Sequence, residues 1–174
     1  MSTPSLSGQR NQLLMDTTWI FFLTSILHFL YGFTKFRPIS YISAVNESVW
    51  EHTKITFFAA LFYDLILYFK DYRGNNNFVA GLAPALFSII LSIPLLFYGY
   101  SGAIGFSFLA MDLFIAFLSA LISQYILKRF TESSKDLSGW KSLSLLLVLA
   151  MIILFFIFTW YPPHLPLFRA PQRG

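Results

Sequence analysis

Five long apolar runs constrain the fold of this chain more than any other sequence feature. They cover about residues 17–33, 55–69, 78–98, 103–127 and 142–160. A helix of about 20 apolar residues is long enough to cross the roughly 30 Å hydrocarbon core of a bilayer. Only 11% of the residues are charged, whereas a soluble domain usually carries about 25%. The sequence therefore predicts an all-α, polytopic protein of the cell membrane, with one domain (residues 1–174) forming a compact bundle of five transmembrane helices.

The second run is too short to cross a bilayer by itself. It is continuously apolar only from Ile55 to Phe69, so we expect its helix to begin upstream, near Asn46, and to span residues 46–69. This start places the polar segment NESVWEH, residues 46–52, in the first two turns of the helix.

The distribution of Lys and Arg predicts the orientation of the bundle. Five spans put the N-terminal tail and the second and fourth loops on one side, with seven basic residues: Arg10, Lys70, Arg73, Lys128, Arg129, Lys135 and Lys141. The other side carries five: Lys35, Arg37, Lys54, Arg169 and Arg173. The positive-inside rule then predicts a cytoplasmic N-terminus and an outer C-terminus. Because membrane topology accounts for these residues, the net charge of +4 is no argument for nucleic-acid binding.

Polar side chains gather on the side that carries the first loop and the C-terminal tail. His28 lies near the end of the first span, and His164 lies in the tail. Asp112 lies nine residues into the fourth span, about 13 Å deep at 1.5 Å per residue. Ionisable groups within a membrane are costly and often mark functional sites. We therefore expect NESVWEH to form one wall of a polar site at this face.

Each residue of that segment also has a structural interpretation. Ser48 and Glu51 fit the S-x-x-E capping box, in which both side chains bond to free amides at a helix start. Glu47 is explained more simply as a cap than as a functional group. Trp50 is typical of the membrane interface. Lys54 is expected either to snorkel to the membrane surface or to pair with Glu47 or Glu51.

Asp64 lies apart from this cluster, near the opposite face of the membrane. Lys70 and Arg73 follow it in the next loop. Since an unpaired carboxylate is costly near hydrocarbon, we expect a local ion pair with one of these two residues.

Neutral imidazoles and carboxylates are ligands of zinc and similar divalent metals. On one helix Glu47 and His52 would be roughly 140° apart around the axis, so ligands would have to come from several helices. We interpret Glu51 and His52 as candidate catalytic residues. Two further sets are the candidate metal ligands His28, His52, Asp112 and His164, and the candidate binding residues His28, Tyr31, Asn46, Glu47, Trp50, Lys54 and Asp112.

Other chemistries are excluded by what the sequence lacks. The chain contains no cysteine, which removes thiol catalysis, disulfides and thiolate metal sites. It also contains no G-x-S-x-G motif and no glycine-rich phosphate loop after a strand, so serine-hydrolase and nucleotide-binding functions have no support.

Three segments carry a resemblance to a known family: HFLYGF from His28, NESVWEHTK from Asn46 and WYPPHLPLF from Trp160. They resemble a family of small prokaryotic integral membrane proteins of unknown function, whose signature is an N-E-S-V-W-E-H-x-K core and a terminal P-P-H segment. The resemblance covers nearly the whole chain. It implies a multi-helix bacterial or archaeal membrane protein and supplies no activity.

Three classes of function remain open. A metal-assisted hydrolase or transferase would act on a lipid or peptide that enters from the bilayer. A small-solute or ion transporter would use Asp112 and the two glutamates as its coupling site, and five spans without an internal repeat would then require a homo-oligomer. In a non-catalytic membrane subunit, NESVWEH would only cap and pack the helix start. The sequence favours catalysis over transport and identifies no substrate.

Overall fold

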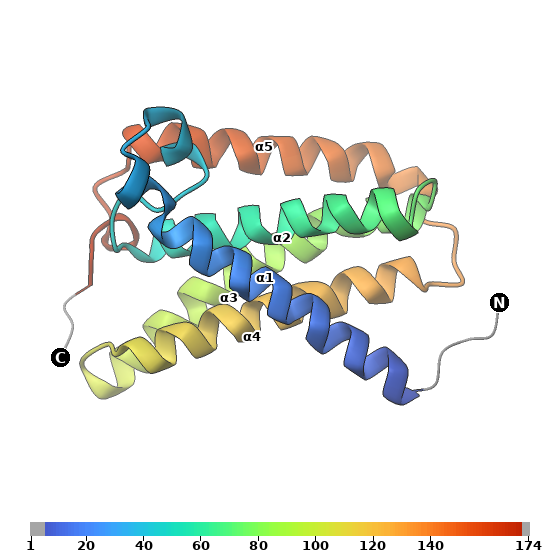
Figure 1. The fold of residues 1–174 in the computed structure, drawn as a ribbon, viewed down its shortest axis with the longest axis horizontal. Coiled ribbons are helices and arrows are strands. Elements are labelled where there is room, and N and C mark those ends of the chain that lie inside the picture. The colour runs from blue at the N-terminus through green and yellow to red at the C-terminus, as the bar shows by residue number, and fades with distance from the viewer. Residues whose placement is uncertain (1–5, 172–174) are drawn as a thin grey trace.

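Five long α-helices make up most of the chain in the computed structural model, which describes residues 6–171 (Figure 1). They are α1 (Leu6–Thr34), α2 (Val49–Asp71), α3 (Asn76–Ile104), α4 (Leu109–Thr131) and α5 (Lys141–Trp160). Three short 3-10 helices are η1 (Arg37–Tyr41), η2 (Ser138–Trp140) and η3 (Pro166–Phe168). No strand occurs within residues 6–171, so the predicted all-α fold class is confirmed.

Four of these helices are long and apolar enough to cross a membrane: α1 from Arg10, α3, α4, and α5 with η2. The remaining helix, α2, has 23 residues and is therefore about 34 Å long, but it carries charged residues within its length. It is also the most enclosed helix, since every side chain from Val49 to Leu61 except His52 is buried. The bundle thus combines four candidate spans with a charged, central helix.

The helices lie roughly along one axis, with α1 crossing the others obliquely (Figure 1). α3 packs against α2, α4 and α5, and α1 packs against α2 and α4. The first described turn of α1 lies at one end of the bundle. The η1 loop, the α3–α4 turn and the tail after α5 lie at the other end (Figure 1).

The turn between α3 and α4 lies later in the chain than the predicted spans placed it. α3 continues to Ile104 and is closed by Gly105, whose φ of +84° is the left-handed conformation that favours glycine. α4 begins at Leu109 rather than at residue 103. Asp112 is consequently in the first turn of α4, so its predicted depth of about 13 Å is wrong.

Gly81 allows α3 and α4 to pack closely, and its replacement by Ala is expected to be destabilising. A Cβ at this position would lie 2.6 Å from Phe130 Cβ. We expect Gly81→Ala to lose about 1–3 kcal/mol of unfolding free energy, because overpacking forces the helices apart, and to unfold at a lower temperature in detergent. Gly102→Ala is the matched control on the same helix, since a Cβ there would meet no atom within 4 Å. Equal thermal midpoints for the two variants would contradict this account of the helix contact.

Candidate metal-binding site

Ser48 caps the start of α2 and thereby leaves Glu47 outside the helix. Its Oγ accepts a hydrogen bond from the Glu51 N–H at 3.3 Å. The Ser48 N–H donates to Asn46 Oδ1 at 2.8 Å, a role that the predicted capping box gave to Glu51. The helix therefore begins at Val49 rather than near Asn46, and Glu47 lies in the preceding turn.

Glu51 and Lys54 form a buried ion pair that ties the η1 loop to α2 and α5. Lys54 Nζ lies 2.7 Å from Glu51 Oε2, and the two side chains are 0% and 2% exposed. The ammonium also donates to Ser40 O at 2.9 Å and to Thr159 Oγ1 at 3.0 Å, which uses all three of its protons. Glu51 Oε2 further accepts the Val45 N–H at 2.9 Å. Of the alternatives expected for Lys54, pairing with Glu51 is confirmed, and it places Glu51 in a structural network.

Ser43 fixes the same loop against α1. Its hydroxyl donates to Leu27 O and accepts the Tyr31 N–H at 2.9 Å, so it is inserted between two backbone groups four residues apart in the helix. His28 follows Leu27 directly. The insertion therefore holds the loop that carries Glu47 beside His28.

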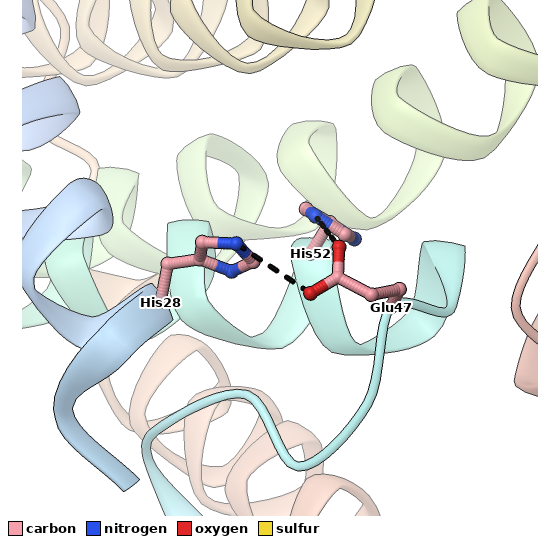
Figure 2. Close-up of side chains that lie close together, drawn as sticks. All are labelled: His28, Glu47 and His52. Atoms are coloured by element: carbon pink, nitrogen blue, oxygen red, sulfur yellow. Dashed lines mark ion pairs between the residues drawn. The ribbon is translucent and has the colours of Figure 1, made fainter. Parts of the chain in front are cut away.

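His28, Glu47 and His52 come together from α1, the loop and α2 (Figure 2). Glu47 lies between the two rings, with Oε1 3.7 Å from His28 Nε2 and Oε2 3.8 Å from His52 Nε2. One ligand atom from each residue lies within 4.8 Å of the other two. Two ligands at 2.0–2.1 Å from a tetrahedral zinc ion are about 3.4 Å apart, so the cluster is close to the dimensions of a metal site.

The imidazole of His52 is oriented by the backbone. Its Nδ1 lies 2.9 Å from Ser48 O, and a carbonyl oxygen can only accept, so Nδ1 carries the proton of this bond. In the neutral ring Nε2 then has a free lone pair on the side of Glu47. Metal-binding histidines are commonly oriented in this way through their other ring nitrogen.

The cluster lines a largely apolar cavity of about 520 Å³ between α1, α2, α3 and α4. This volume lies within the range of about 300–1,000 Å³ usual for small-molecule sites. Phe29, Leu109 and Leu113 of its wall are also exposed on the outside of the bundle, so the cavity adjoins the outer apolar surface. Its more enclosed apolar wall consists of Val49, Ile55, Ile93, Phe97 and Ile115.

Asp112 lines this cavity without joining the cluster of ligand atoms. Tyr100 Oη donates to its Oδ1, which links the last turns of α3 to the first turn of α4. His164 is exposed in the turn after α5. Within residues 6–171, neither Asp112 nor His164 belongs to the group of close ligand atoms, so the four predicted ligands do not converge as a set.

The C-terminal segment folds back over this end of the bundle. Trp50 is buried, and its ring lies 4.7 Å from that of Phe155 in α5 and 4.9 Å from that of Phe168 in η3, measured between centroids. The tail therefore covers Trp50, whereas the side chain of an interfacial belt residue would be exposed to the lipid. Pro171 lines the cavity, so the tail completes its wall.

Tyr31 and Asn46 do not line the apolar cavity. Together with His28 and Glu47 they line a second, more open cavity of about 380 Å³. Glu47 has a half-exposed side chain and contributes to both cavities. The site can therefore be reached from the loop side as well as from the apolar cavity.

Two residues that shape the site were missed by sequence reasoning. Tyr100 pairs with Asp112 across the α3–α4 turn, and an aromatic hydroxyl 12 residues before a carboxylate at a helix hairpin could have indicated this contact. The sequence contains no comparable indication for Ser43, because its hydrogen-bond partners on α1 depend on how the loop folds back.

The fold and the site define an all-α protein with four candidate membrane spans and a His–Glu–His cluster at one end of its bundle. The model of a family of unknown function, DUF6512, matches residues 1–174, and the chain belongs to this family. None of the curated proteins and none of the solved structures compared with the chain matches it.

Proposed function

We propose that all five helices cross the membrane, with α2 as the enclosed central span. Its length of about 34 Å is sufficient for the roughly 30 Å hydrocarbon core. Glu51 and Lys54 form an ion pair within the bundle, which lowers the cost of placing two charges there. The excess of basic residues on the side of the N-terminus, seven against five, supports an orientation with that end in the cytoplasm.

The central proposal is a divalent-metal site, best suited to zinc, with His28, Glu47 and His52 as ligands. The observation that carries it is the convergence of the three side chains with the Nε2 atom of each ring directed at Glu47. Two histidines and one glutamate form a known ligand set of catalytic zinc, in which a fourth position stays open for water or substrate. The half-exposed side chain of Glu47 leaves space for that fourth ligand.

A direct ion pair between Glu47 and protonated histidines accounts less well for the same geometry. Charge-assisted hydrogen bonds of this type are about 2.7–2.9 Å long, whereas the two distances here are 3.7 and 3.8 Å. The carboxylate also faces both rings at once, one oxygen to each. This spacing leaves room for an ion between the three groups.

The apolar cavity supports hydrolysis of a single-chain amphiphile as the reaction. A divalent metal held by His28, Glu47 and His52 would polarise a carbonyl or phosphoryl oxygen and would supply a water of lowered pKa as the nucleophile for an ester, phosphoester or amide. An acyl chain in the cavity would hold the polar end of such a substrate at the cluster. The exposed wall residues Phe29, Leu109 and Leu113 favour entry from the bilayer.

Filling the cavity tests this substrate class without touching the metal ligands. Ala116 lies on the cavity wall, whereas Ala110 is exposed on the same helix outside the cavity. We expect Ala116→Phe to lower kcat/KM for long-chain amphiphiles at least tenfold, about 1.4 kcal/mol, with zinc content unchanged. Ala110→Phe should leave both quantities unchanged.

The assay uses purified, zinc-loaded protein and a panel of fluorogenic ester, phosphoester and amide amphiphiles. Zinc-dependent turnover that is lost in Glu47→Gln is the expected result. Bound zinc without turnover of any member of the panel would overturn the hydrolase proposal and favour a non-catalytic metal-binding membrane protein. Zinc uptake into proteoliposomes under the same conditions would instead favour transport.

A further inference from the structure

A second polar centre lies around Asp64, in the other half of α2. The residue is fully buried, and Gln124 Nε2 of α4 donates to its Oδ1 at 2.8 Å. Oδ2 is also buried and has no hydrogen-bond partner among the described residues. The expected ion pair with Lys70 or Arg73 is wrong, since Asp64 faces the bundle interior and Lys70 approaches Asp71 instead, at 4.0 Å.

Among the described residues, no cation forms an ion pair with this carboxyl group. α1 contributes Asp16, which accepts hydrogen bonds from Tyr63 Oη at 2.6 Å and Gln12 Nε2 at 2.8 Å and adds a like charge near Asp64. On α4, the Nζ atom of Lys128 lies 3.8 Å from Oε1 of Glu132 and so pairs with that carboxylate. Within residues 6–171, no ion pair includes Asp64.

An ionised Asp64 would be costly in this position. Taking a carboxylate out of water without a cation is unfavourable, and the usual outcome is that the group takes up a proton. Gln124 can satisfy either form: its amide N–H donates to the carboxylate, and after a half-turn of the amide its Oε1 accepts from the carboxylic acid. The pair is therefore suited to reversible protonation.

A cavity lies next to this centre, toward the nearby end of the bundle. The cavity, of about 230 Å³, is lined by Asp16, Gln124, Lys128 and Glu132, with Phe78 contributed by α3. Gln124 lies between the cavity and Asp64, since its side chain lines the cavity and donates a hydrogen bond to Asp64. A rotation of this side chain would thus connect the buried carboxyl to water.

We propose that Asp64 is a reversible proton-binding site, which holds a neutral carboxylic acid in the resting protein and exchanges its proton through the cavity at Gln124. Buried carboxyl groups within membrane bundles serve as proton relays in pumps and transporters. The proposal is independent of the metal site, because His52 and Asp64 are 12 residues apart on α2, about 18 Å along the helix.

Infrared spectroscopy of the full-length protein at neutral pH, in H₂O and D₂O, tests this assignment. We expect a carboxylic acid C=O band that is lost in Asp64→Asn and retained in Asp16→Asn, the matched change at the neighbouring carboxyl. Asp64→Asn should unfold at the same temperature as the unsubstituted protein, because asparagine has the shape of the neutral acid and can keep the bond to Gln124. In Gln124→Leu the band should persist and move to higher frequency, since the acid loses its hydrogen bond.

Two results would overturn the proposal. A C=O band that is unchanged in Asp64→Asn, or no band in the unsubstituted protein, would mean that Asp64 is ionised. Disappearance of the band on adding sodium or lithium chloride at constant pH would identify a metal-cation site instead. If Asp64→Asn does not fold, an unshifted band in Gln124→Leu would equally count against the assignment.

Discussion

Replacing His52 with Ala is expected to lower the affinity of the protein for zinc by at least about 100-fold. The change removes a proposed ligand whose tautomer is fixed by Ser48 O, and loss of an outer-shell hydrogen bond alone typically costs 10–100-fold in metal affinity. His28→Ala should have an effect of the same order, because its Nε2 faces the same carboxylate. Competition with a chromogenic chelator, using purified protein in detergent, measures both affinities.

His164→Ala is the matched control for these variants. His164 is exposed and lies outside the group of close ligand atoms, so its loss should leave zinc affinity unchanged. Zinc binding should also weaken as the pH falls in the unsubstituted protein, because protonated imidazoles do not bind metal. Equal affinities for His52→Ala and His164→Ala would show that zinc binds elsewhere.

Replacing Lys54 with Met is expected to cost on the order of 3–5 kcal/mol of unfolding free energy, since it leaves a buried carboxylate without its cation. Lys54 is 0% exposed and joins Glu51, Ser40 and Thr159. The loop that carries Glu47 loses one of its anchors in this variant, so zinc affinity should fall as well. Denaturant unfolding in detergent, followed by circular dichroism, measures the loss.

Two further variants separate the charge effect from a general effect of losing a lysine. Glu51→Gln with Lys54→Met removes both charges and should recover most of the stability. Lys70→Met removes an exposed lysine that lies 4.0 Å from Asp71 and should cost less than about 1 kcal/mol. A loss in Lys54→Met no larger than in Lys70→Met would contradict the structural role of the buried pair.

The apolar runs predict the helices well because a membrane span needs a long, uninterrupted apolar segment. Helix ends are less predictable where no charge or proline interrupts the pattern. Residues 99–108 contain neither, and the position of Gly105 determines where α3 ends. The start of α2 depends on which side chain caps it, and the bond from the Ser48 N–H to Asn46 moves that start to Val49.

The position of the candidate cluster in the fold was easier to predict than the residues that form it. Topology alone places His28 and His52 at the same end of the bundle, and the structure brings them together with Glu47. Which glutamate faces the two histidines depends on Lys54. Its ammonium forms a buried ion pair with Glu51, which leaves Glu47 beside the histidines. The loop contacts of Ser40 and Ser43 decide this arrangement, and contacts between a loop and distant helices leave no periodic trace in a sequence.

For Asp64 the predicted partner was wrong. Its nearness in sequence to Lys70 and Arg73 favoured an ion pair, but its side chain points to α4 and contacts Gln124. Which face of α2 is enclosed depends on the packing of four neighbouring helices, so sequence distance to a basic residue did not indicate the partner.

X-ray absorption at the zinc edge tests the central claim most directly. Purified protein reconstituted with one equivalent of zinc is predicted to show nitrogen and oxygen ligands at about 2.0–2.2 Å, with outer-shell scattering from two imidazole rings. In the His28→Ala, His52→Ala double variant the imidazole scattering should disappear. A spectrum with oxygen ligands alone, or one that the double substitution leaves unchanged, would contradict a zinc site formed by His28, Glu47 and His52.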